Sequence, residues 1–178
     1  PFLIIIAAFI FIAAGAEADA AALHDSARDL TVGEAMLTEY STFHPSDTIR
    51  TSVEKLIRSS DEIFPVIDEK GRAFGFVTRQ ALLAAMANEA NETPVSSLMS
   101  ASDEAVIESD NLEKVLSRFE QDERPAFIVE GTDGRAIGLL TRASLAQAIL
   151  IHTARPGWHG HRGGLIAASL PGLKKRSW

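Results

Sequence analysis

Apolar residues recur at helical spacing in two stretches of the chain, and each stretch is followed by two short apolar runs. In the first stretch residues 49, 53, 56 and 57 are apolar, and runs at 64–67 and 74–77 follow. In the second, residues 112, 115, 116 and 119 precede runs at 127–129 and 137–140. Spacings of three and four residues predict helices, and short runs around a glycine-containing turn predict paired strands.

Each stretch is also expected to open with a short strand and to close with a second helix. The opening strands are expected at residues 42–44 and 105–107, and Asp47 and Asp110 then stand where a carboxylate can cap a helix. The last strands end at Thr78 and Thr141, which can cap helices at residues 79–86 and 142–151. The pattern therefore predicts the order β-α-β-β-α twice.

The two stretches are copies of one another. A shift of 63 residues places Met36 on Met99 and residues 71–79 on residues 134–142 without a gap. One unit of this size buries little of its own surface, and two copies are too few for a solenoid. We therefore expect an α/β (α+β) fold of two units, at residues 31–90 and 91–152, packed as a pseudo-twofold pair.

The two ends of the chain differ from this middle part. Residues 1–16 carry no charge, and a helix over residues 1–14 would be about 21 Å long, against about 30 Å of hydrocarbon in a bilayer. We expect the end of a transmembrane segment there, the alternatives being a buried helix or the remnant of a signal peptide. Residues 17–30 are expected to form a helical connector, and residues 153–178 a basic, flexible tail.

Charge and composition exclude several functions. The formal net charge is −7, and all 24 acidic residues lie within residues 17–150, so we expect no nucleic-acid partner. The chain has no cysteine, and none of its five histidines is followed by glutamate. It also lacks a Gly-x-Ser-x-Gly turn and a phosphate-binding loop. We therefore assign no catalytic residue and no metal ligand within this chain.

An ordered set of short motifs occurs in both copies. They include the segments Val32-Gly33-Glu34-Ala35-Met36, Phe64-Pro65-Val66-Ile67-Asp68 and Gly75-Phe76-Val77-Thr78-Arg79, with counterparts at 95–99 and 138–142. In these motifs the chain resembles a pair of cystathionine-β-synthase (CBS) domains over residues 31–151. The resemblance implies a flattened disc that often forms a homodimer. It also implies up to two clefts for adenosine nucleotides such as AMP, ADP or ATP.

The resemblance also implies which residues would bind the nucleotide. Thr78 and Thr141 would contact phosphate, and the region of Pro65 would help to enclose the adenine. The family's ribose-binding aspartate is replaced by Ala81 in the first copy and by Ser144 in the second, which makes the cleft of Thr141 and Ser144 the better candidate. Both threonines also suit plain helix caps. Arg79 and Arg142 offer charge to a phosphate, or serve as exposed residues at a helix start.

A second resemblance concerns the protein to which such a pair belongs. An apolar helix, a short connector and a CBS pair follow one another in the carboxy-terminal part of bacterial site-2-protease-type intramembrane zinc metalloproteases. This resemblance implies a regulatory pair on the cytoplasmic side of a membrane, with the zinc site and catalytic residues of the hydrolase upstream of Pro1. The alternatives are a ligand-free structural dimerisation module and a CBS pair of a channel or transporter.

Overall fold

The structure is a computed structural model that describes residues 24–88, 90–102, 104–122 and 124–154. The apolar segment expected at residues 1–16, the beginning of the 17–30 connector and residues 155–178 of the basic tail lie outside the described residues. Among the helices that the structure does describe, none is both long and apolar enough to cross a bilayer.

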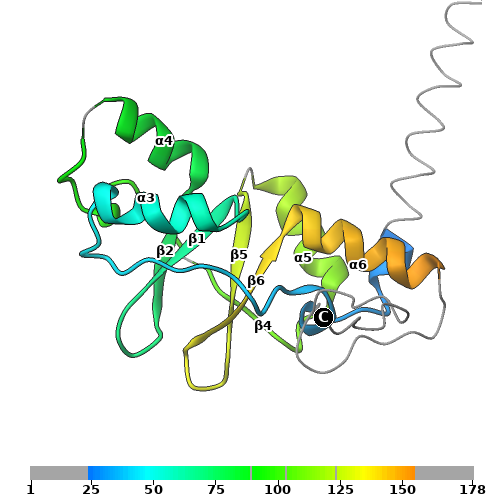
Figure 1. The fold of residues 1–178 in the computed structure, drawn as a ribbon. Helices are drawn as coiled ribbons and strands as arrows, with labels where there is room; N and C mark the ends of the chain where they lie inside the picture. The colour runs from blue at the N-terminus through cyan, green and yellow to red at the C-terminus, as the bar shows by residue number, and fades with distance from the viewer. Residues whose placement is uncertain (1–23, 89, 103, 123, 155–178) are drawn as a thin grey trace, which may run out of the picture.

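The two halves of the chain share the order helix, strand, strand, helix (Figure 1). The first half contains α3 (Ile49–Arg58), β1 (Ile63–Ile67), β2 (Ala73–Thr78) and α4 (Arg79–Ala87). The second contains β4 (Val106–Ile107), α5 (Leu112–Gln121), β5 (Ala126–Glu130), β6 (Ala136–Thr141) and α6 (Arg142–Ala154). The predicted α+β pair is confirmed. The expected strand at 42–44 is shorter than predicted, because only Phe43 pairs, with Val66.

The starts of α3 and α5 differ from the prediction by one residue. Thr48 and Asn111 are the capping residues, and their side-chain oxygens accept hydrogen bonds from the backbone N–H groups of Thr51 and Glu113. The carboxylates of Asp47 and Asp110 instead accept from residues three positions earlier, at 3.0 Å each. These aspartates therefore stabilise the turn that leads into the helix rather than the helix itself.

Each half gives its opening segment to the other half. Leu37, which follows the short helix α2 (Val32–Ala35), pairs with Leu139 of β6. At the equivalent place β3 (Ser100–Ala101), which follows η1 (Val95–Ser97), pairs antiparallel with β2 of the first sheet. The two sheets therefore have the orders β1-β2-β3 and β4-β5-β6, each with a pairing from the opposite repeat. The backbone itself joins the two units.

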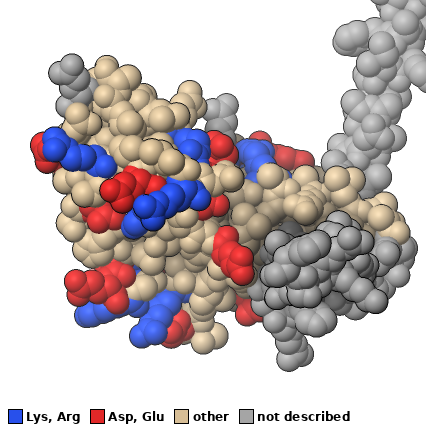
Figure 2. Space-filling model, in the orientation of Figure 1, with Lys and Arg blue, Asp and Glu red and all other residues tan. Residues whose placement is uncertain are grey.

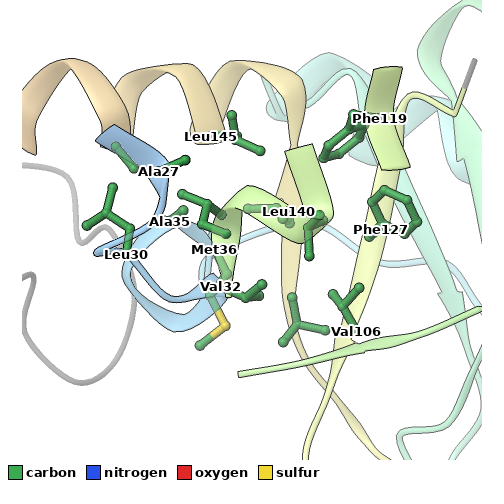
Figure 3. Close-up of a cluster of buried hydrophobic side chains, with 14 of the residues drawn as sticks. Ala27, Leu30, Val32, Ala35, Met36, Val106, Phe119, Phe127, Leu140 and Leu145 are labelled. Atoms are coloured by element: carbon green, nitrogen blue, oxygen red, sulfur yellow. The ribbon is translucent and has the colours of Figure 1, made fainter. Parts of the chain in front are cut away.

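The exchanged segment α2 contributes to the core of the second half (Figure 3). Val32, Ala35 and Met36 are at most 3% exposed and pack in one cluster with Leu140 and Leu145. The matching cluster of the first half contains Val95 from η1, with Met99 packed against it. Because burial of a valine or methionine side chain contributes about 1.5–3 kcal/mol, neither core is complete without residues from the other repeat.

The two β-hairpins lie side by side at the lower edge in Figure 1. The backbone N–H of Ala136 donates a 2.9 Å hydrogen bond to the carbonyl of Gly71 in the other hairpin. Gly71 and Gly134 occupy equivalent turn positions at φ +81° and +73°, a region that side chains disfavour. Between the sheets Ala126, Ile128 and Leu139 form a smaller apolar cluster, against which Tyr40 and Ile63 pack.

The described end of the connector is fastened to the second half. Residues 24–27 are helical, and Ala27 and Leu30 are 0% and 4% exposed within the second-half core. His24 lies 3.2 Å from the carboxylate of Glu120, and Arg28 lies 3.1 Å from that of Glu113. Because Glu113 and Glu120 are two turns apart on α5, the connector follows this helix.

Candidate functional site

An open cleft lies between the first sheet and the loop from α5 to β5. Its volume is about 380 Å³, within the range of about 300–1,000 Å³ that is usual for small-molecule sites. The lining residues are Phe76 of β2, Ser100 and Ala101 of β3, and Asp122, Arg124 and Pro125 of the loop. The first half supplies β2, and the second repeat supplies β3 and the loop. The width of the cleft therefore depends on how the two halves are packed.

The walls of the cleft contain an ion pair between two side chains and the edge strand of a sheet. Arg124 and Asp122 lie 3.5 Å apart, with 28% and 45% of their side chains exposed. β3 is the last strand of its sheet, so its outer side presents backbone donors and acceptors. A ligand with a flat polar edge and one anionic group would match these features, since a guanidinium group binds phosphate or carboxylate well.

Thr141 and Ser144 are not among the residues that line the cleft, and they are bonded to each other. Thr141 is paired with Ala126, the residue after the lining Pro125. The Thr141 hydroxyl accepts from the Ser144 N–H at 3.0 Å, and the Ser144 hydroxyl accepts from the Thr141 N–H at 3.0 Å. Ser144 is only 3% exposed. In this conformation both residues cap α6, and their roles toward phosphate and ribose stay predictions.

Arg142 and Arg79 hold the carboxy-terminal ends of neighbouring helices. The Arg142 guanidinium donates to the carbonyl oxygens of Phe119 and, at 3.0 Å, of Asp122. At the equivalent place Arg79 donates to Leu56, Ser59 and Asp61 carbonyls at 2.6–3.0 Å.

Each arginine also lies over an aromatic ring. Arg142 is 5.2 Å from the centre of Phe119, and Arg79 is 5.7 Å from that of Phe64. The hydrogen bonds of the two arginines satisfy backbone carbonyl groups that the end of a helix leaves without a partner. The arginines are therefore neither exposed helix-start residues nor, in this conformation, free for a phosphate.

The remaining predicted residues lie in the first half. The Thr78 hydroxyl accepts from the Ala81 N–H at 3.2 Å and so caps α4. Pro65 is buried in the middle of β1, opposite Phe76 of β2, and its carbonyl accepts from the Phe43 N–H at 3.0 Å. Neither Thr78 nor Pro65 lines the 380 Å³ cleft, although Phe76, the strand partner of Pro65, does.

The charges around the molecule are mixed. On the face shown in Figure 2, acidic and basic side chains are interspersed. The ion pairs of the described residues include Arg72 with Asp68 at 3.0 Å. Among the residues that the structure describes, no group of three histidine or acidic side chains is placed to hold a metal ion.

The sequence did not predict Arg124 or β3 as parts of the site. Comparing the repeats emphasises positions at which they agree, whereas Arg124 stands where the first copy has Asp61. The change from Asp61 in the first copy to Arg124 in the second, close to a predicted nucleotide cleft, is the sequence feature that could have indicated Arg124.

Comparison with known proteins identifies the fold. Residues 32–88 match the CBS domain family. A CBS-pair protein, CBSX2 from Arabidopsis thaliana, is 26% identical with a TM-score of 0.62, over 70% of this chain and 97% of its own. No curated protein sequence matches the chain.

Two further similar structures contain ligands. CBSX2 in complex with AMP is 27% identical with a TM-score of 0.60, over 69% of this chain and 98% of its own. The CBS domain pair of protein MJ0100, in complex with 5′-methylthioadenosine and S-adenosyl-L-methionine, is 18% identical with a TM-score of 0.60, over 71% of this chain and 98% of its own. Residues 32–88 therefore match the CBS domain family, and the described chain has the fold of a tandem CBS pair.

Proposed function

We propose that this CBS pair is a regulatory module that binds an adenosine derivative in the cleft lined by Arg124. The cleft itself carries the proposal, because it offers a sheet edge, a proline and one arginine within about 380 Å³. The similar structures with AMP and with S-adenosyl-L-methionine support this class of ligand. Among the described residues one arginine lines the cleft, and Asp122 partly neutralises it, so a monophosphate fits better than a triphosphate.

Binding would act through the packing of the halves. The cleft has one wall from each half, so an arrangement that brings the walls together binds a ligand more tightly than one that separates them. A ligand shifts such an equilibrium only by its difference in affinity between the two arrangements. The α5–β5 loop follows the helix that also holds the connector through Glu120, which gives a short route from the cleft to residues upstream.

Calorimetric titration with AMP, ADP, ATP and S-adenosyl-L-methionine tests the binding. We expect AMP to bind, and the variant Arg124→Glu to bind at least tenfold more weakly. Arg135→Glu is a matched control, because Arg135 is also paired with an aspartate, at 3.4 Å, but lies in a hairpin turn outside the cleft. Absence of heat and of a thermal shift at millimolar concentrations of all four compounds would reject a sensing role.

We propose a homodimer formed through helices of the first half. Ile57 of α3 is 79% exposed and Leu83 of α4 is 49% exposed, whereas the equivalent positions of the second half are Glu120 and Ala146. Large exposed apolar side chains on adjacent helices favour association. Light scattering of the double variant Ile57→Glu, Leu83→Glu should give a monomer. A dimer in the absence of any nucleotide binding would favour the alternative of a purely structural module.

We also propose that the pair belongs to a membrane protein, with a site-2-type zinc metalloprotease as the first candidate and a channel or transporter as the alternative. The apolar composition of residues 1–16 supports membrane attachment, with the pair on the cytoplasmic side. The docking of residues 24–30 on the second half supports a regulatory connection to that segment. The coding sequence upstream of Pro1 decides between them, since the protease requires a His-Glu-x-x-His motif there.

A further inference from the structure

The internal repeat allows each wall of the cleft to be compared with its counterpart in the first half. Residues that line the cleft correspond, 63 positions earlier, to Leu37, Thr38, Ser59, Asp61 and Glu62, and Phe76 corresponds to Leu139. The backbone pairings that build the two places also correspond, since Leu37 pairs with Leu139 as Ser100 pairs with Phe76. The first half thus has an equivalent place for a ligand, with different side chains.

Tyr40 packs against one wall of this equivalent place. Its side chain packs against the cluster of Ala126, Ile128 and Leu139, and the last of these is the counterpart of the cleft-lining Phe76. Tyr40 is half-buried, and this burial raises the pKa of its hydroxyl above the ordinary value of 10.0. The second copy has Asp103 at the corresponding position in the sequence, so no aromatic ring is available there.

Asp61 fastens the segment that carries Tyr40. Its carboxylate accepts hydrogen bonds from the Ser41 N–H at 2.9 Å and from the Ser59 hydroxyl at 2.6 Å. It therefore joins the residue after Tyr40 to the loop between α3 and β1.

The second half has different pairs at the equivalent positions. Arg124, the counterpart of Asp61, pairs with Asp122 in its own loop. Glu104, the counterpart of Ser41, pairs instead with Arg118 of α5 at 2.5 Å. Among the described contacts, Arg124 therefore does not join the segment before α5 to the loop after α5, as Asp61 does for α3.

We propose that Tyr40 and Asp61 close the first of the two equivalent places, so that one chain binds one adenosine-class ligand, in the cleft of Arg124. This inference deepens the proposed function and rests on it. Tyr40 takes the space, and Asp61 holds it there and places a negative charge where a phosphate would approach. The two residues determine the stoichiometry and confine anionic ligands to the second half.

Exchange of residues between the halves tests the proposal with AMP as the probe in calorimetry. We expect one AMP per chain for the unmodified protein. The double variant Tyr40→Asp, Asp61→Arg gives the first half the residues of the second, and we expect it to bind two. Two AMP per chain in the unmodified protein would overturn the proposal, as would one AMP in a double variant whose circular dichroism shows an intact fold.

A second measurement needs no nucleotide and so separates the closure from the proposed function. Tyr40 is the only tyrosine of the chain, so an isotope-labelled tyrosine gives one set of ring signals. We expect a soluble gadolinium chelate to relax these signals weakly in the unmodified protein and at least threefold faster in Asp61→Ala. Strong relaxation in the unmodified protein would refute the closure. Weak relaxation together with no AMP binding would refute the proposed function alone.

Discussion

Met36 of the first repeat lies directly over Gly138 of the second, and a Cβ atom on Gly138 would come within 2.5 Å of the Met36 sulfur. The repeat places Met99 over Gly75 in the same way, and there a Cβ atom would lie 2.8 Å from the Met99 Cγ and 2.1 Å from the Ser100 carbonyl oxygen. Each glycine therefore leaves room for the segment that arrives from the opposite half.

This close approach predicts unequal costs for two equivalent substitutions. Gly75→Ala meets a backbone oxygen of β3, which cannot move without breaking the strand pairing, and we expect a loss of about 3 kcal/mol or more. Gly138→Ala meets the flexible side chain of Met36, and we expect a loss of about 1 kcal/mol. Urea denaturation of the two variants measures the difference in the free energy of unfolding.

Gly134→Ala serves as the control for this pair. A Cβ atom on Gly134 would meet nothing within 4 Å, so the substitution tests backbone strain alone at φ +73°. We expect a cost of about 1–2 kcal/mol. Equal losses for Gly75→Ala and Gly138→Ala would contradict the proposed difference between the two contacts.

The repeat made the helices and central strands predictable, but not the exchange of segments. Spacing along α3 and α5, and the turns at Gly71 and Gly134, are local features that the sequence displays directly. The segment α2 could pack on its own half or on the other half. Its sequence and the shift of 63 residues between the copies are the same in either case. Contacts between the halves, such as those of Leu37 with Leu139 and of β3 with β2, distinguish the two arrangements.

The predicted nucleotide-binding residues stay predictions, and the cleft that the structure forms is lined by other residues. Thr141 ends β6 and caps α6 as predicted, because strand ends and helix starts follow from the local pattern. Arg142 is engaged with helix carbonyls, which depends on the distant end of α5 and has no local signal. The differences between the copies at Tyr40 and Asp61, rather than their similarities, indicate which place is open.

The two helix-capping arginines should be needed for stability. We expect Arg79→Lys and Arg142→Lys each to lower the free energy of unfolding by about 1–3 kcal/mol, because a single ammonium group cannot bond several carbonyls and lie flat on a ring. Thermal unfolding measures the contribution of each arginine to stability, and calorimetric titration of the same variants with AMP measures its contribution to binding. Arg142→Lys that keeps full stability but loses AMP affinity would show that the side chain serves the phosphate instead.

The carboxylate of Asp61 should make stability depend on acid pH. Burial by itself raises the pKa of Asp61, but hydrogen bonds from Ser59 and Ser41 and the charge of Arg79 outweigh it, so the pKa lies below its ordinary value of 3.8. A lowered pKa contributes stability that is present above pH 3.8 and is lost as the pH falls through the folded-state pKa.

We therefore expect Asp61→Asn to cost about 1 kcal/mol near neutral pH, and the difference from the unmodified protein to shrink as the pH falls below 3.8. Denaturation curves at neutral pH and at several acidic pH values measure this trend. A difference that stays constant down to the lowest pH at which both proteins fold would exclude an ionised Asp61 as its source.

The connector should be held by apolar burial rather than by its ion pairs. Leu30 is 4% exposed in the core of the second half, and Leu30→Ala should lower the free energy of unfolding by about 2–4 kcal/mol. The Arg28 side chain is 61% exposed beside Glu113, so Arg28→Ala should change stability much less. Hydrogen exchange of residues 24–30 gives a local measurement. Faster exchange in Arg28→Ala than in Leu30→Ala would mean that charge, not burial, docks the connector.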